Sequence, residues 1–64
     1  MLLENLYRVL FENQRVVLRD MRKQKTLWYG LVRNIPVDYL SWTVAGIKSW
    51  SINLNDSEIR IYLI

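Results

Sequence analysis

The chain has 64 residues with no Cys and no His, which excludes a disulfide framework, a zinc site built on Cys or His, a thiol nucleophile and a histidine base. An apolar fraction of 52% argues against disorder, and the length allows one domain, residues 1–64, held by packing or by self-association. Nine Lys and Arg against six Asp and Glu give a net charge of +3, a modest bias towards anionic partners.

The sequence also predicts where the protein works. No apolar run approaches the ~20 residues of a membrane span, and the first residues lack the basic segment and cleavage site of a secretory signal. The absence of Cys is compatible with a reducing compartment. We therefore expect a cytoplasmic protein with no membrane partner.

Residues 2–12 predict a three-turn helix. Apolar residues follow the i, i+3, i+4, i+7 spacing of one helical face: Leu3, Leu6, Tyr7 and Leu10. An isolated helix of this length is marginal in water, so we expect its leucine face to lie on a sheet. Its polar side has only one basic residue, Arg8, which argues against a helix on a membrane surface.

Two strands with a polar turn between them are expected next. Residues 15–21 alternate, with Val16 and Leu18 on one face, whereas residues 27–33 are rich in large apolar residues and predict a strand buried on much of both faces. Residues 22–26 predict the exposed turn. Gly30 predicts a bulge, a bend or the close approach of another group, such as a neighbouring Trp.

Pro36 ends the second predicted strand because proline cannot donate a hydrogen bond to a neighbouring strand. Residues 37–42 are long enough for a short helix or 3₁₀ turn, with Tyr39 and Leu40 pointing inwards. A third strand is expected to begin between Thr43 and Ser49.

Residues 50–64 predict a β-hairpin with its turn at residues 55–57. Apolar residues alternate with polar ones along both arms: Trp50, Ile52 and Leu54, then Ile59, Ile61 and Leu63. A loop of two or four residues would place Ile52 opposite Ile59 or Ile61. If the last strand forms a sheet edge, it lacks the charge or proline that prevents strand addition by another chain.

These elements predict an α+β fold in which an N-terminal helix packs on a four-stranded antiparallel sheet, in the order α-β-β-short helix-β-β. Parallel pairing is not expected, because the segments are short and closely connected. The alternative is a small, partly open β-barrel. The predicted core consists of aliphatic residues: Leu6, Leu10, Val16, Leu18, Leu31, Leu40, Val44, Ile52, Ile59 and Ile61.

The sequence predicts no catalytic residue. Its carboxylates form no paired arrangement, and the phosphate-loop, dinucleotide-binding and EF-hand patterns are absent. Asp56 and Glu58, near the predicted hairpin tip, are interpreted as solvated turn residues because nothing there would exclude water. We expect no enzyme, no cofactor and no metal site.

Two groups of residues are candidates for binding. Aromatic residues, which often dominate protein interfaces, form the first group: Trp28, Tyr39, Trp42, Trp50 and Tyr62. Basic residues that adjoin aromatic ones, and could hold phosphates while bases stack, form the second group: Arg19, Arg22, Lys23 and Lys25.

The first group predicts a small interaction protein that presents aromatic and aliphatic surface to a protein partner or to a second copy in a homodimer. The second group supports the alternative, a nucleic-acid-binding accessory protein. Because Asp20 lies among the basic residues and the net charge is only +3, a solvated turn is the simpler interpretation of that group.

A resemblance covers residues 27–64. The matching elements, in order, are Leu27-Trp28-Tyr29-Gly30, Ile35-Pro36, Tyr39-Leu40, Val44, Ile47 and Ile59-Arg60-Ile61-Tyr62. This pattern of strand, Ile-Pro turn, short helix and hairpin resembles small uncharacterised proteins of phages and other mobile elements of Gram-positive bacteria. The resemblance implies a non-enzymatic accessory role and brings no active site or ligand.

Overall fold

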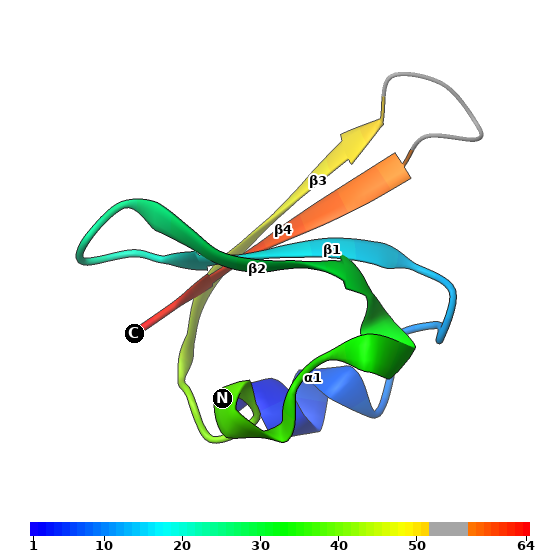
Figure 1. Cartoon of the computed structure of the whole chain (residues 1–64), viewed down its shortest axis with the longest axis horizontal. Coiled ribbons are helices and arrows are strands. Elements are labelled where there is room, and N and C mark those ends of the chain that lie inside the picture. The colour runs from blue at the N-terminus through cyan, green and yellow to red at the C-terminus, as the bar shows by residue number, and fades with distance from the viewer. Residues whose placement is uncertain (52–56) are drawn as a thin grey trace.

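The computed structural model describes residues 1–51 and 57–64, with residues 49–51 and 57 described by their backbone alone. The elements in chain order are α1 (Leu3–Tyr7), β1 (Arg15–Asp20), β2 (Lys25–Leu31), the 3₁₀ turns η1 (Val32–Asn34) and η2 (Val37–Tyr39), β3 (Val44–Ser51) and β4 (Ser57–Leu63). The strands form one sheet, and α1 and the 3₁₀ turns lie on the same side of it (Figure 1). The predicted α+β class, with an N-terminal helix and four strands, is confirmed.

The sheet is mixed, so the predicted antiparallel sheet is wrong in one pairing. Its order is β2-β1-β4-β3, and the two inner strands, β1 and β4, run parallel to each other. Parallel strands need a long connection, and the chain from β2 to β3 supplies one. Within the described residues, β2 and β3 do not pair with each other, so the sheet is open and the β-barrel alternative is also wrong.

The alternation along β1 buries one face of the sheet. Val16 and Leu18 pair with Ile59 and Ile61 of β4, and paired residues point to the same face. Fully buried Leu3 of α1 belongs to the core on this face, which confirms that the leucine face lies on the sheet. The buried core consists of Leu3, Val16, Leu18, Val32, Ile35, Ile61 and Leu63.

The predicted core agrees with this set in part. Val16, Leu18 and Ile61 are buried, and five predicted residues pack against the core while half-buried: Leu6, Leu10, Leu40, Val44 and Ile59. The prediction that Leu31 belongs to the core is wrong, because Leu31 pairs with Arg15 and so points to the other face of the sheet. Ile52 lies outside the described residues. Four buried residues were not in the predicted core set, although Leu3 was expected on the helix face that packs on the sheet: Leu3, Val32, Ile35 and Leu63.

The helix α1 ends at Tyr7, five residues earlier than predicted. The backbone N–H of Arg33 donates to the carbonyl of Glu12 at 3.2 Å, and that of Val32 donates to Gln14 at 2.9 Å. These bonds extend the pairing of β1 with β2 backwards to Glu12, so the chain has left the helix before that residue. The spacing rule found the apolar contacts of the segment but not its end.

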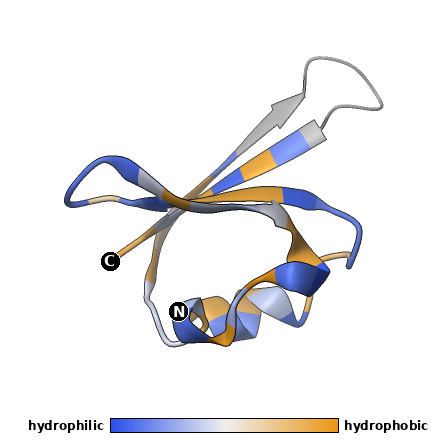
Figure 2. Cartoon of the chain, viewed as in Figure 1, coloured by the Kyte–Doolittle hydropathy of each residue, from blue (hydrophilic) through white to orange (hydrophobic). Residues whose placement is uncertain are grey.

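The turn between β1 and β2 is built on Asp20, a buried side chain. Its Oδ1 atom accepts hydrogen bonds from the backbone N–H groups of Arg22 at 2.9 Å and Lys23 at 3.1 Å. Figure 2 shows the hydrophilic character of this turn, as predicted. Leu18 pairs with Trp28 and Arg19 with Thr26, so the strand pairing shifts by one residue beside the turn.

β2 differs from its prediction in position and burial. It begins at Lys25 and ends at Leu31, whereas the prediction was residues 27–33. Val32 and Arg33, predicted as the end of the strand, belong to η1. Tyr29 is 75% exposed, so the predicted burial on both faces is wrong. Gly30 confirms the predicted close approach of a Trp, because a Cβ atom there would lie 2.9 Å from the Trp28 ring.

The short helix expected in residues 37–42 is confirmed as η2, and the third strand begins at Val44, within the predicted window. Ile61 pairs with Ile47 and Ile59 with Ser49, so the predicted pairing with Ile52 is wrong. Residues 52–56, including Leu54 and most of the predicted turn, lie outside the described residues. Because β4 is an inner strand, it offers no edge for strand addition.

Candidate functional site

The sheet face opposite α1 has no helix over it among the described residues (Figure 1). We call it the open face. It is formed by the side chains that alternate with the core residues along the strands: Arg15, Val17, Arg19, Tyr29, Leu31, Lys48, Glu58, Arg60 and Tyr62. Strand pairing places Arg19 beside Tyr62 and sets Val17 between Tyr29 and Arg60.

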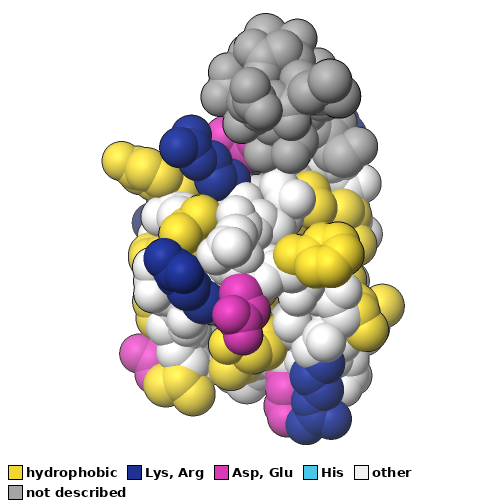
Figure 3. Space-filling model, turned by 90° about the vertical axis from the view of Figure 1, so that its right-hand side faces the viewer, with side chains coloured by type: hydrophobic (Ala, Val, Ile, Leu, Met, Phe, Trp, Pro, Cys, Tyr) yellow, Lys and Arg dark blue, Asp and Glu magenta, His cyan; other side chains and the backbone are white. Residues whose placement is uncertain are grey.

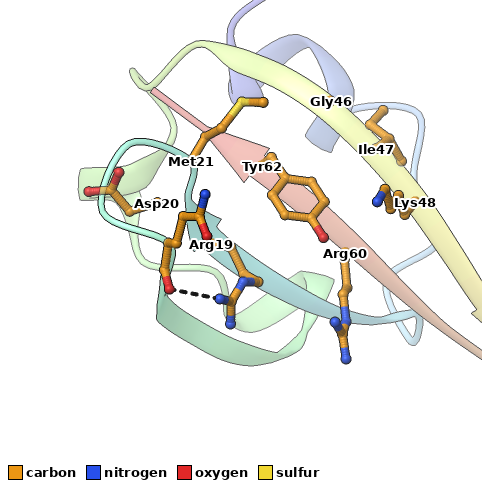
Figure 4. Close-up of a pocket in the computed structure, with 9 residues that line it drawn as sticks. Arg19, Asp20, Met21, Gly46, Ile47, Lys48, Arg60 and Tyr62 are labelled. Carbon is orange, nitrogen blue, oxygen red and sulfur yellow. Dashed lines mark hydrogen bonds between the residues drawn. The ribbon is translucent and has the colours of Figure 1, made fainter.

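A hollow of about 480 Å³ lies at one end of the open face. In Figure 4 the ring of Tyr62 lies at its centre, with Arg19, Lys48 and Arg60 around it. The Lys48 Nζ atom lies 5.7 Å from the centre of the Tyr62 ring, within cation-π range. Gly46, which pairs with Tyr62, adds no side chain to the hollow.

Arg19 is held in place by the β1–β2 turn. Its two terminal guanidinium nitrogens donate to Thr26 Oγ1 at 2.8 Å and to the Gln24 carbonyl at 2.9 Å. Within the described part of the chain, no carboxylate lies within ion-pair distance of Arg19 or Lys48, whereas Arg60 Nε lies 3.8 Å from Glu58 Oε1. Asp20 also borders the hollow, and its carboxylate accepts hydrogen bonds from the turn backbone. Arg19, Lys48 and Arg60 outnumber Asp20 and the nearby Glu58, so the hollow has a net positive charge.

A second hollow, of about 490 Å³, lies further along the open face. Its lining includes Arg15, Val17, Tyr29, Leu31 and Glu58. Tyr29 is largely exposed, so its ring and hydroxyl are available to a ligand. The open face thus has one Tyr at each hollow, the half-buried Tyr62 and the largely exposed Tyr29. Three basic side chains border the first hollow, whereas Arg15 and Glu58 border the second.

The charges are divided between the two sides of the molecule. Of the nine Lys and Arg residues, all except Arg8 and Arg33 lie on the open face or between Arg22 and Lys25 beside it. Arg8 forms an ion pair with Glu4 at 3.1 Å, and Arg33 donates to Asn13 Oδ1 at 3.1 Å, both away from the open face.

The acidic residues show the opposite distribution. Among those that the structure describes, Glu58 alone lies on the open face. Glu4 belongs to α1, Glu12 to the segment that follows α1, and Asp38 to η2. These elements lie on the covered side (Figure 1). Asp20 is buried beneath the β1–β2 turn.

The structure brings the predicted basic residues next to cations that the sequence analysis missed. Arg22, Lys23 and Lys25 are exposed in or beside the turn, and Arg19 enters the first hollow. Lys48 and Arg60 reach the same hollow from β3 and β4. The alternation with Ile59 and Ile61 predicts the face of Arg60. Its neighbour Lys48 comes from the antiparallel pairing with β3, whereas the approach of β1 with Arg19 depends on the parallel pairing.

The predicted aromatic residues do not form one surface. Trp28, Tyr39 and Trp42 are half-buried and pack against the core on the covered side. The Tyr39 hydroxyl donates to the Leu27 carbonyl at 3.3 Å, and the Tyr39 and Trp42 rings meet edge to face with centroids 6.1 Å apart. Tyr62 lies on the open face, on the opposite side of the sheet from these three residues. The structure describes only the backbone of Trp50.

The described residues include no helix long and apolar enough to cross a membrane. They also include no group of three or more acidic side chains arranged to hold a metal ion. The resemblance noted in the sequence stays a prediction. In comparisons with protein families, curated proteins and solved structures, the chain matches none.

Proposed function

We propose that the protein is a non-enzymatic accessory protein that binds nucleic acid through the open face and the adjoining residues 22–25. The observation that carries this proposal is the separation of charge. Basic residues gather on the one sheet face that no described helix covers, and most described acidic residues lie on the other side. A nucleic-acid backbone carries regular negative charge, and Lys and Arg that neutralise it release counterions.

A solvated turn explains only part of this arrangement. It accounts for Arg22, Lys23 and Lys25, which are exposed at a hairpin end. It does not account for Lys48, which lies on another strand and shares a hollow with Arg19. Like charges that border one hollow repel each other, and an anionic ligand there would relieve that repulsion.

Two double variants test the proposal, because each removes two positive charges from one side of the molecule. Arg22→Ala with Lys23→Ala removes them beside the open face, whereas Arg8→Ala with Arg33→Ala removes them from the covered side. Binding of a labelled single-stranded oligonucleotide is measured by fluorescence anisotropy over a range of salt concentrations. The first variant should bind more weakly, and its slope of log affinity against log salt should be shallower by about 1.4.

The second variant is the matched control, since both proteins have the same net charge, and it should bind nearly as the unmodified protein does. Equal losses in both variants would show that net charge alone sets the affinity, which contradicts a site on the open face. No binding of the unmodified protein at low salt would dismiss the proposal.

A second candidate function, contact with another copy of the chain, is favoured by a different observation. Val9 and Phe11, after α1, are 74% and 84% exposed. Figure 3 shows hydrophobic side chains in several separate places on the side of the molecule where the chain passes from α1 to β1. Light scattering at increasing concentration should show a dimer that Phe11→Ser weakens, and a monomer at every concentration would contradict this candidate.

A further inference from the structure

We infer that the open face takes single-stranded nucleic acid, with one base stacked on Tyr62 and another on Tyr29. This inference rests on the proposed function and adds the class of nucleic acid and the residues that contact its bases. It depends on where the two rings lie, on the size of the hollows beside them and on the cations between them.

The two Tyr residues are spaced so that separate bases can reach them. Tyr62 lies beside Arg19 on β1, and Tyr29 lies on the other side of β1 beside Val17. Two strand spacings across the sheet and two residues along it put their backbones about 12 Å apart. Each ring borders its own hollow, of about 480 Å³ and 490 Å³, and hollows of this size suit a ligand as large as a nucleoside.

Basic side chains lie along the path between the rings. Arg60 lies two residues from Tyr62 on β4, and its pairing partner Val17 is also the partner of Tyr29. Arg19 lies beside Tyr62 at the start of the path. A strand that crosses from one ring to the other therefore passes Arg19 and Arg60, and their guanidinium groups can contact the phosphates that link the bases.

The sheet favours unpaired bases over a duplex. In a duplex, the faces of the bases are covered by their neighbours, and readout needs a helix or ribbon that enters a groove. The described part of the open face has no such protruding element, whereas a sheet with aromatic rings on its surface can stack bases that are splayed out from a single strand. Tyr29 is exposed for this contact, and the half-buried Tyr62 ring borders the first hollow. Charge complementarity therefore selects a nucleic acid, and the accessible rings select its single-stranded form.

Stacking of a base on Tyr62 requires the Lys48 side chain to move. Its ammonium group lies over the Tyr62 ring, where a base would stack. The side chain is exposed at the rim of the hollow, so it can swing away without disturbing the core. Once displaced, the ammonium group can contact a phosphate, and the position over the ring passes to the base.

The test compares three probes on the full chain: a single-stranded oligonucleotide, a strand of the same length that carries abasic sites, and the duplex of the same sequence. DNA and RNA versions of each probe are used. The single strand should bind at least about 5-fold more tightly than the abasic strand, because one stacked base contributes that much or more. It should also bind more tightly than the duplex at the same salt concentration.

Substitutions assign the effect to the rings. Tyr62→Leu and Tyr29→Leu should each weaken binding of the single strand by about 5-fold or more, with little change for the abasic strand. Tyr62→Phe keeps the ring and should restore the affinity. Tyr29 is largely exposed, so its variant keeps the test valid if Tyr62→Leu fails to fold, which circular dichroism would show.

The outcomes separate the two levels of the proposal. If the abasic strand and the duplex bind as tightly as the single strand, and the Leu variants lose nothing, the stacking inference is overturned while the proposed function stands. If none of the probes binds at low salt, the proposed function itself fails.

Discussion

At the scale of single residues, Gly30 shows how a missing side chain sets local structure. Its φ angle of +156° lies in a region that residues with a Cβ atom rarely adopt. A Cβ atom there would lie 2.9 Å from two carbon atoms of the Trp28 ring. The ring occupies that space and packs against the core on the covered side. Gly30 therefore allows β2 to bring a large aromatic ring onto the core.

Gly30→Ala should lower the free energy of unfolding by about 1–3 kcal/mol, because the new methyl group meets the Trp28 ring and the backbone angle becomes strained. Gly46→Ala, on the strand at the opposite edge of the sheet, is the matched control. A Cβ atom there would meet only the Tyr62 ring, at 4.0 Å, which is an ordinary contact. Urea denaturation measures both variants, and equal stability would contradict this account of Gly30.

Asp20 shows what the sequence could not reveal about a single residue. In the sequence it stands among basic residues and weakens the case for an anion site. In the structure its carboxylate is buried and accepts hydrogen bonds from the backbone of Arg22 and Lys23. Asp20 thus fixes the turn that presents the cations. Alternation places Asp20 on the face of Val16 and Leu18, but its hydrogen bonds depend on the conformation of the turn, which the local pattern does not contain.

At the scale of elements, alternation predicted the strands well. Val16 and Leu18 in β1, and Ile61 in β4, each lie two residues from the next core position, and all three are buried as expected. Alternation works here because a strand points successive side chains to opposite faces, and one face of this sheet is the core. The helical spacing of residues 2–12 also identified side chains that pack against the core, although α1 ends at Tyr7.

The pairing of the elements was harder to predict. Alternation gives the face of a residue but not the strand beside it, and several pairings satisfy the same pattern. The predicted hairpin used Ile52, yet Ile47 and Ser49 pair with the Ile residues of β4. The parallel pair of β1 and β4 links parts of the chain far apart in sequence, so no local signal predicts it.

At the scale of the whole molecule, the candidate site is a product of topology. Arg19 was predicted as part of a basic turn, whereas Lys48 and Arg60 were not. The order β2-β1-β4-β3 places β4 beside β1 and β3 beside β4, and this brings all three cations around Tyr62. The antiparallel pair of β3 and β4 brings Lys48 beside Arg60, and the parallel pair of β1 and β4 adds Arg19 beside Tyr62.

The central claim is that the open face binds nucleic acid while the covered side holds the core together. Nuclear magnetic resonance tests it most directly, by following the backbone amide signals while a single-stranded oligonucleotide is added at low salt. The account predicts shifts that concentrate in β1, β4, residues 21–25, β2 around Tyr29 and β3 around Lys48, with little change in α1 and η2. Shifts that concentrate in α1 and η2, or no shifts at all, would contradict it.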